Sequence, residues 1–211
     1  MGKVENKKRQ KKEALLNTAF DLFIAKGIQK TSISDIVEKA GVAKGTFYLY
    51  FTDKYDLRNK LIAHKANQLF NSAYDSMIQE GIVDFEERIL FICNYVMNQL
   101  QEDHSLLRLI NKHLSWGIFK NALIQADGDY ERGVFDIYEK ILSQSRHRFL
   151  EPEIMVFLIV EMVGATVYSP ILYQQPAPLE EIKPYIFDNI RSIIRRHILD
   201  TENTKPTSFL N

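Results

Sequence analysis

Side chains that bind phosphates and base edges are concentrated in a short stretch of the N-terminal quarter of the chain. Lys44, Gly45 and Thr46 stand together, and Tyr48 and Tyr50 follow at alternate positions. A lysine ammonium group pairs with phosphate or guanine, and hydroxyl groups bond to phosphate oxygens or base edges. Gly45 lets a backbone approach closely because it has no side chain. These residue types predict a surface that contacts nucleic acid.

Catalytic and metal-binding patterns give no competing prediction. The sequence has no G-x-S-x-G, H-E-x-x-H, C-x-x-C, G-x-G-x-x-G or P-loop motif. The single Cys93 excludes an intramolecular disulfide, which is typical of a reducing cytoplasm, and we interpret it as a small buried apolar residue. The histidines lack metal-ligand spacing; they are His64, His104, His113, His147 and His197. We therefore predict no enzyme, no metal site and no cofactor.

The elements that must position the first stretch are short helices. A first helix carries Leu15, Ala19, Leu22 and Phe23 on one face and ends at Gly27. The second begins at Ser32, whose spacing to an aspartate three residues later is a capping-box pattern. A glycine at position 41 permits a sharp turn into a third helix over about 44–51. Such a compact trio predicts a helix-turn-helix at about 31–51.

Helical periodicity continues through most of the remaining chain, without convincing strand alternation. We expect an all-α fold of about nine helices in two domains, a helix-turn-helix DNA-binding domain over 8–62 and a larger helical domain over 63–200, followed by a polar tail over 201–211. Asp53 is expected to cap a long helix from Lys54 to about Gln79. The later helices are expected at about 84–101, 105–125, 129–148, 152–168 and 179–199.

The charge is distributed unevenly along the chain. Residues 1–65 hold 14 basic and 7 acidic residues, whereas residues 66–211 hold 13 basic and 20 acidic ones. This asymmetry indicates a polyanionic partner for the basic end, although a solvated basic tail or an anionic membrane surface would also fit. The most apolar run, 154–167, contains Glu161 and is too short to span a membrane. We expect a cytoplasmic protein.

The sequence from Thr31 to Phe51, continued to Leu57, resembles the tetracycline-repressor (TetR) family. The resemblance covers about residues 10–62 and is carried by Ala-Gly-Val at 40–42, Gly-Thr at 45–46, Phe-Tyr-x-Tyr-Phe at 47–51 and the lysine at 54. It implies that the third helix faces the major groove and that the second helix meets a phosphate. Leu49 differs from the family pattern, in which the residue at this variable position is often polar or aromatic. The residues implied to contact DNA are Thr31, Ser32, Lys44, Gly45, Thr46, Tyr48, Tyr50 and Lys54.

The resemblance also implies a homodimer through 152–168 and 179–199, and a small-molecule ligand bound within the second domain. Candidate lining residues are Tyr95, Met97, His113, Trp116, Phe119, Met155, Glu161 and Tyr168, for each of which plain core is the alternative. Glu161 would meet a cationic ligand or lie in the dimer interface. The expected function is a repressor that a ligand releases from a palindromic DNA operator. An activator, a regulator controlled by a protein partner, and a non-DNA interaction module remain alternatives.

Overall fold

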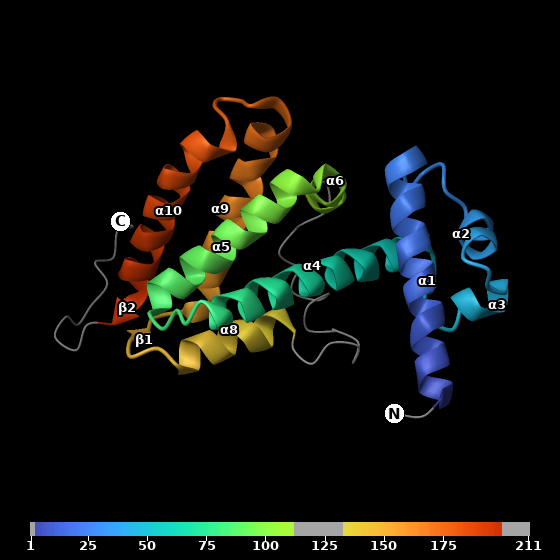
Figure 1. Ribbon diagram of the computed structural model, residues 1–211, viewed down its shortest axis with the longest axis horizontal. Coiled ribbons are helices and arrows are strands. Elements are labelled where there is room, and N and C mark those ends of the chain that lie inside the picture. The colour runs from blue at the N-terminus through green and yellow to red at the C-terminus, as the bar shows by residue number, and fades with distance from the viewer. Residues whose placement is uncertain (1–2, 112–132, 200–211) are drawn as a thin grey trace, which may run out of the picture. The chain divides into compact units, whose positions relative to one another are not determined.

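The computed structural model describes residues 3–111 and 133–199, and this part of the chain contains nine helices and one pair of two-residue strands (Figure 1). Both the helical fold class and the approximate number of helices are therefore confirmed. The elements are α1 (Lys3–Lys26), α2 (Ile33–Lys39), α3 (Lys44–Phe47), α4 (Lys54–Gln79), α5 (Phe85–Glu102), α6 (His104–Asn111), α8 (Val134–Ser143), β1 (Arg148–Phe149), α9 (Pro152–Tyr173), α10 (Leu179–His197) and β2 (Ile198–Leu199).

The chain divides into two compact units, and the division falls within α4. The N-terminal unit holds α1, α2, α3, α4 up to Ser72, α6 and the start of α8 up to Asp136, and the C-terminal unit holds the rest. The predicted domain limits of 8–62 and 63–200 also divide the chain within α4, and as exact limits they stay a prediction.

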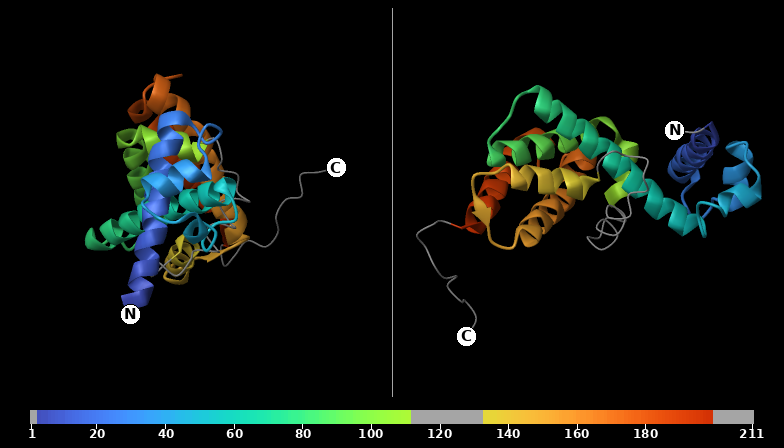
Figure 2. Two further views of the ribbon diagram at one scale, coloured as in Figure 1. Left: turned by 90° about the vertical axis from the view of Figure 1, so that its right-hand side faces the viewer. Right: turned by 90° about the horizontal axis from the view of Figure 1, so that it is seen from below.

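A single apolar cluster holds the N-terminal unit together, with α2 and α3 lying on one side of α1 (Figures 1 and 2). Its largest members are fully buried, so they supply most of the unit's hydrophobic stabilisation. Gly27 adopts a φ of 78° after α1, as expected of a glycine that ends a helix. The buried members of the cluster are Leu15, Leu16, Ala19, Phe23, Ile36, Val37, Phe47, Phe51, Leu57, Leu61, Ile62 and Leu109.

The C-terminal unit is built around α9 and α10, which pack on each other and on α5. The ion pair between Arg191 and Glu86, at 3.2 Å, joins α10 to α5. Lys183 is also largely buried on α10, and its Nζ donates to Asn98 Oδ1 at 2.6 Å. Arg191 and Lys183 are therefore paired across helices, as burial favours.

Two sequence predictions for this unit are wrong. The helix that begins at Pro152 ends at Tyr173 rather than near 168: Pro170 stands in its last turn and is buried there, although a proline removes one intrahelical hydrogen bond. The N–H of Gln174 bonds to the carbonyl of Pro170 and closes the helix end. The second error lies at the end of the helix expected over about 129–148: the helix ends at Ser143, and residues 148–149 instead form a missed strand pair, in which Phe149 is paired with Ile198.

The apolar run at 154–167 lies within the longer helix α9. Among the described residues, α9 is the one helix that is long and apolar enough to cross a membrane by length and composition alone, a criterion that a core helix of a soluble protein also meets.

Candidate nucleic-acid interface

The start of α2 is fixed by a capping box. The Asp35 N–H donates to Ser32 Oγ at 3.1 Å, and the Ser32 N–H donates to Asp35 Oδ2 at 2.9 Å. Lys26 at the end of α1 donates to the same carboxylate oxygen at 2.8 Å. The Lys26 bond, followed by the bonds to Ser32, lowers the pKa of Asp35 from 3.8 to about 2. These bonds confirm the predicted helix start and tie α2 to α1.

The turn between α2 and α3 depends on Gly41, which adopts a φ of 67°. The Val42 N–H bonds back to the Val37 carbonyl at 3.0 Å and closes the turn. Phe47 and Phe51 then anchor the next segment, because both side chains are almost completely buried and their rings lie 5.4 Å apart. With one side of this segment fixed in the core, the remaining side chains face outward.

The outward side chains form what we call the recognition surface: Ser32, Lys44, Gly45, Thr46, Tyr48 and Leu49. Tyr48 is 53% exposed and Leu49 is 77% exposed, although both are large hydrophobic side chains. Lys44 is exposed and forms no ion pair with another described residue. A side chain at Gly45 would meet no atom within 4 Å, so its own unit does not require a glycine there. The surface therefore offers a free cation, hydroxyl groups and an apolar side chain to a partner.

Three of the implied contact residues are instead engaged within the protein. Thr31 is buried, and its hydroxyl donates to the Gly27 carbonyl at 2.8 Å. The ammonium group of Lys54 donates to three carbonyl oxygens in the loop before α2, those of Ile28, Gln29 and Thr31, at 3.0–3.2 Å. The Tyr50 hydroxyl donates to the Lys8 carbonyl at 3.1 Å. These side chains position the surface, and their direct contact with DNA stays a prediction.

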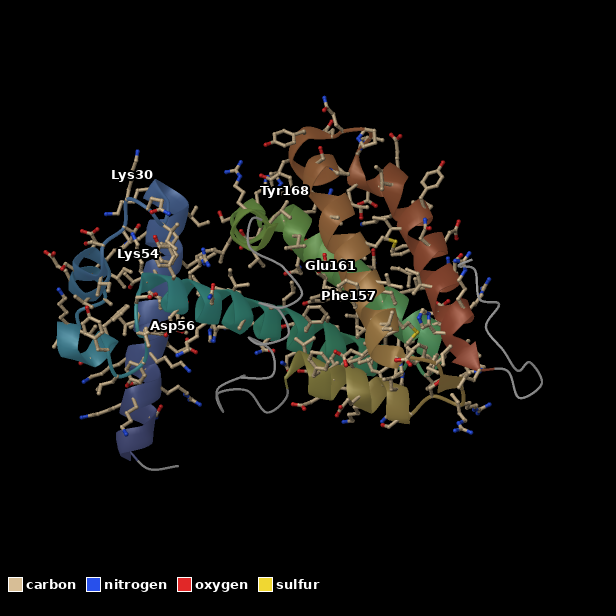
Figure 3. The ribbon with its side chains drawn as sticks, turned by 180° about the vertical axis from the view of Figure 1, so that it is seen from behind. Lys30, Lys54, Asp56, Phe157, Glu161 and Tyr168 are labelled. Atoms are coloured by element: carbon tan, nitrogen blue, oxygen red, sulfur yellow. The ribbon has the colours of Figure 1, made fainter. Side chains whose placement is uncertain are left out.

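The start of α4 adds positioning residues that sequence reasoning missed (Figure 3). Asp53 caps α4 as predicted, because its Oδ1 accepts from the N–H groups of Tyr55 and Asp56. The missed residues are Asp56, whose Oδ2 accepts from the Thr52 N–H at 2.8 Å, and Lys60, whose ammonium group donates to the Tyr50 carbonyl at 2.9 Å. Their signal was available, since both are charges in the first two turns of a helix that directly follows the recognition segment.

The candidate ligand residues are only partly described. His113, Trp116 and Phe119 lie outside the described residues. Tyr95 and Tyr168 are half-buried, and the Tyr168 ring packs edge-on against Tyr173 at 6.1 Å. Met97 and Met155 are fully buried, as ordinary core residues are. The described chain brings no three His, Cys, Asp or Glu side chains together in a metal-binding group.

Glu161 is the exception among these candidates (Figure 3). Its Oε1 atom is buried and has no hydrogen-bond partner among the described residues. A buried polar atom without a partner costs about 1–3 kcal/mol, so such atoms are rare in native proteins. Glu161 therefore marks a place on α9 where a donor from outside the described protomer would be favourable.

Comparison with known proteins agrees with this geometry. The model of the family described as "Bacterial regulatory proteins, tetR family" matches residues 15–61, which include the whole recognition surface. HTH-type transcriptional regulator YvdT of Bacillus subtilis is 34% identical over 124 residues, which are 50% of this chain and 62% of YvdT. The fatty acid metabolism regulator protein of B. subtilis is 25% identical over 137 residues, 65% of this chain and 69% of that protein. The chain thus spans about three fifths of YvdT.

Solved structures extend the similarity to both units. A putative TetR-family regulator from Syntrophomonas wolfei superposes with a TM-score of 0.63 at 20% identity, covering 92% of this chain and 99% of its own. FadR of B. subtilis, solved in complex with stearoyl-CoA, superposes with a TM-score of 0.62 at 19% identity. The superposition covers 86% of this chain and 98% of FadR. At these identities the structures show a shared fold. The N-terminal unit is thus similar to the helix-turn-helix of tetR-family bacterial regulatory proteins, and the chain shares the fold of the solved TetR-family structures.

Proposed function

We propose that the protein is a cytoplasmic, sequence-specific DNA-binding transcriptional regulator, most simply a repressor that leaves its operator when a small molecule binds. The observation that carries the proposal is the recognition surface, where Lys44 and Tyr48 remain exposed while Phe47 and Phe51 are buried. This arrangement presents the start of α3 to a groove and holds it rigidly from behind. A lysine and a tyrosine hydroxyl at that place suit phosphate and base-edge contacts.

A homodimer through α9 and α10 is part of the proposal. Ile154 and Leu158 are 48% and 39% exposed, and Ala165 is exposed on the same face of α9, given their helical spacing. A second protomer would cover this apolar stripe, as the burial of apolar area favours. Two recognition surfaces would then read half-sites about 34–36 Å apart. Light scattering should give a dimer for the wild type and a monomer for Leu158→Glu; a wild-type monomer contradicts the arrangement.

The ligand is proposed to bind in the C-terminal unit. Support comes from the unpaired Glu161 oxygen and from FadR, a relative of the same fold solved with stearoyl-CoA. Stearoyl-CoA is therefore the first probe, added to a preformed protein–DNA complex, with free coenzyme A as the control. Release of DNA by stearoyl-CoA alone supports an acyl ligand. If neither compound releases DNA, stearoyl-CoA is excluded as the effector and a donor-bearing ligand for Glu161 becomes the next test.

Selection of bound duplexes from a random DNA pool tests the proposed function itself. We expect the wild-type chain to enrich a near-palindromic site, because a symmetric dimer presents the same surface twice. Lys44→Ala and Tyr48→Ala should lose this enrichment. The matched control is Lys140→Ala, which removes a lysine of the C-terminal unit and should select the same site as the wild type. Enrichment of no sequence at low salt would contradict the proposal.

A further inference from the structure

The first turns of α1 carry a dense positive charge, which we call the N-terminal basic segment, residues 7–12. Its sequence is Lys-Lys-Arg-Gln-Lys-Lys, without an acidic residue. Lys7, Lys8, Arg9 and Lys11 are exposed, and none of the four forms an ion pair with a residue whose side chain the structure describes. The recognition surface does not include this segment, so its charge has no function in the mechanism described so far.

The local physics of this segment is unfavourable in the isolated protein. Lys7 and Lys11 are four positions apart, as are Lys8 and Lys12, and like charges at this spacing repel each other on a helix. The segment is nevertheless helical and continuous with the rest of α1. A row of negative charges beside it would turn this repulsion into attraction. Such a conflict between local preference and structure is common at functional sites.

A hydrogen bond ties the basic segment to the recognition segment. The Tyr50 hydroxyl donates to the Lys8 carbonyl at 3.1 Å, and the Tyr50 carbonyl accepts from Lys60 on α4 at 2.9 Å. Tyr50 lies three residues after the end of α3, so one residue joins the start of α1 to the recognition segment. The N-terminal turns of α1 extend past α3 in two perpendicular views (Figures 1 and 2).

Composition favours DNA over a lipid surface as the partner. A helix that lies on a membrane needs large apolar side chains on one face. Residues 5–13 contain none, and Leu15 and Leu16, the next large apolar residues, are buried in the core. A polyanion requires only exposed cations at a fixed position, and residues 7–12 provide these.

We infer that the N-terminal basic segment binds the phosphate backbone of the duplex that flanks the bases read by the recognition surface. This inference rests on the proposed function and adds a second, sequence-independent contact to it. The lysines neutralise phosphates and release counterions, so they contribute affinity and salt dependence but no choice of sequence. The Tyr50 bond keeps the segment in register with α3.

Salt-dependent binding to two duplexes tests the inference: the selected site alone, and the same site with unrelated flanking sequence. The variant is Lys7→Gln/Lys8→Gln/Lys11→Gln in the full chain, and the control is Arg146→Gln/Arg148→Gln/Arg196→Gln, which removes the same charge from exposed positions of the C-terminal unit. The slope of log K against log salt should fall by about 0.9 for each phosphate that the lysine variant no longer neutralises. The lysine variant should also lose the preference for the longer duplex, but it should select the same sequence as the wild type. The salt slope of the arginine control should equal that of the wild type.

Equal slopes for the wild type and the lysine variant overturn the inference. Flotation of the wild type, but not the variant, with vesicles containing phosphatidylserine, together with equal slopes on DNA, overturns it in favour of a lipid surface. If the wild type selects no site, the proposed function is refuted instead. The salt slopes of the wild type and the lysine variant on an unselected duplex then still show whether the N-terminal basic segment binds phosphate. Circular dichroism of the variant checks that the helices are retained. Tyr50→Phe, which keeps every cation, should lose part of the flanking preference.

Discussion

The two units treat their polar groups differently. In the N-terminal unit, several polar side chains around the recognition surface form hydrogen bonds with residues close by in the sequence: Ser32 with Asp35, Thr31 with Gly27, and Asp53 with the start of α4. In the C-terminal unit, Glu161 carries a buried oxygen without a described partner, and Ile154 and Leu158 are exposed on the same helix. Around the recognition surface the described polar groups that position the fold are paired within the chain, whereas on α9 a buried oxygen and two apolar side chains have no described partner.

This difference matches the two tasks of the proposed regulator, which are to read DNA and to respond to a ligand or a second copy of the chain. A surface that reads DNA must be rigid before it binds, since loose side chains would pay for their ordering on association. A surface that responds to a ligand or a second protomer gains from groups whose partners are supplied on binding, because differential interaction is what shifts an equilibrium. The contrast leads to four predictions, from the largest expected effect to the smallest.

The largest effect is expected at the core of the N-terminal unit. Phe47→Ala should lower the free energy of unfolding by about 3–5 kcal/mol, because Phe47 is fully buried and its removal leaves a cavity. Leu49→Ala, two residues away and 77% exposed, is the matched control and should change stability by less than about 0.5 kcal/mol. Urea denaturation measures both. Similar losses for the two variants would mean that the segment does not have a buried and a free side.

A smaller loss is expected when the loop before α2 loses its cation. Lys54→Met should lower the free energy of unfolding by about 2 kcal/mol, since one charged group donates three hydrogen bonds to backbone carbonyls. Lys44→Met is the control, because that side chain is exposed and should leave stability unchanged. If Lys54→Met is as stable as the wild type but binds DNA poorly, Lys54 acts on phosphate rather than on the loop.

In the C-terminal unit the sign should reverse. Glu161→Leu is expected to raise the free energy of unfolding of the ligand-free protein by about 1–3 kcal/mol, because it removes a buried acceptor without a described partner. Glu161→Gln keeps the shape and removes only the charge, so its gain should be smaller. Thermal unfolding distinguishes the variants. A destabilised Glu161→Leu would show that the carboxylate is already paired in the free protein.

The smallest effect concerns acid stability. The pKa of Asp35 lies at about 2 instead of 3.8, so its contribution to stability is complete above pH 3.8 and is lost as the pH falls through about 2. Asp35→Asn should therefore be less stable than the wild type at neutral pH, and the two should converge as the pH approaches 2. Urea denaturation across this pH range measures the convergence. A constant difference would show that the Lys26 and Ser32 bonds do not depend on the charge of Asp35.

The features that the sequence revealed are those whose partners lie close by along the chain. The capping box at Ser32, the turn at Gly41 and the cap at Asp53 all join residues a few positions apart, and local patterns predict them. The role of Lys54 was not visible, because its carbonyl partners lie 23–26 residues earlier. The length of α9 was also missed, since burial of Pro170 within the fold outweighs the usual breaking effect of proline.

The ligand and dimer surfaces remain the least predictable parts for the same physical reason. Whether an apolar residue such as Leu158 or Met155 lines a surface or a core depends on tertiary packing, and their sequence context on α9 is similar. The structure separates them, with Met155 buried and Leu158 39% exposed. Glu161 stood out in the sequence as a charge in an apolar helix, but only the fold shows that one of its oxygens lacks a described partner.

The most direct test of the central claim compares Lys44→Ala with the wild type on the selected duplex and on a scrambled duplex of the same length, at one salt concentration. If the recognition surface reads bases, the variant should lose about 1–3 kcal/mol of binding free energy on the selected duplex and much less on the scrambled one. Equal losses on both duplexes would reduce Lys44 to a phosphate contact. No loss on either would contradict the assignment of this surface to DNA.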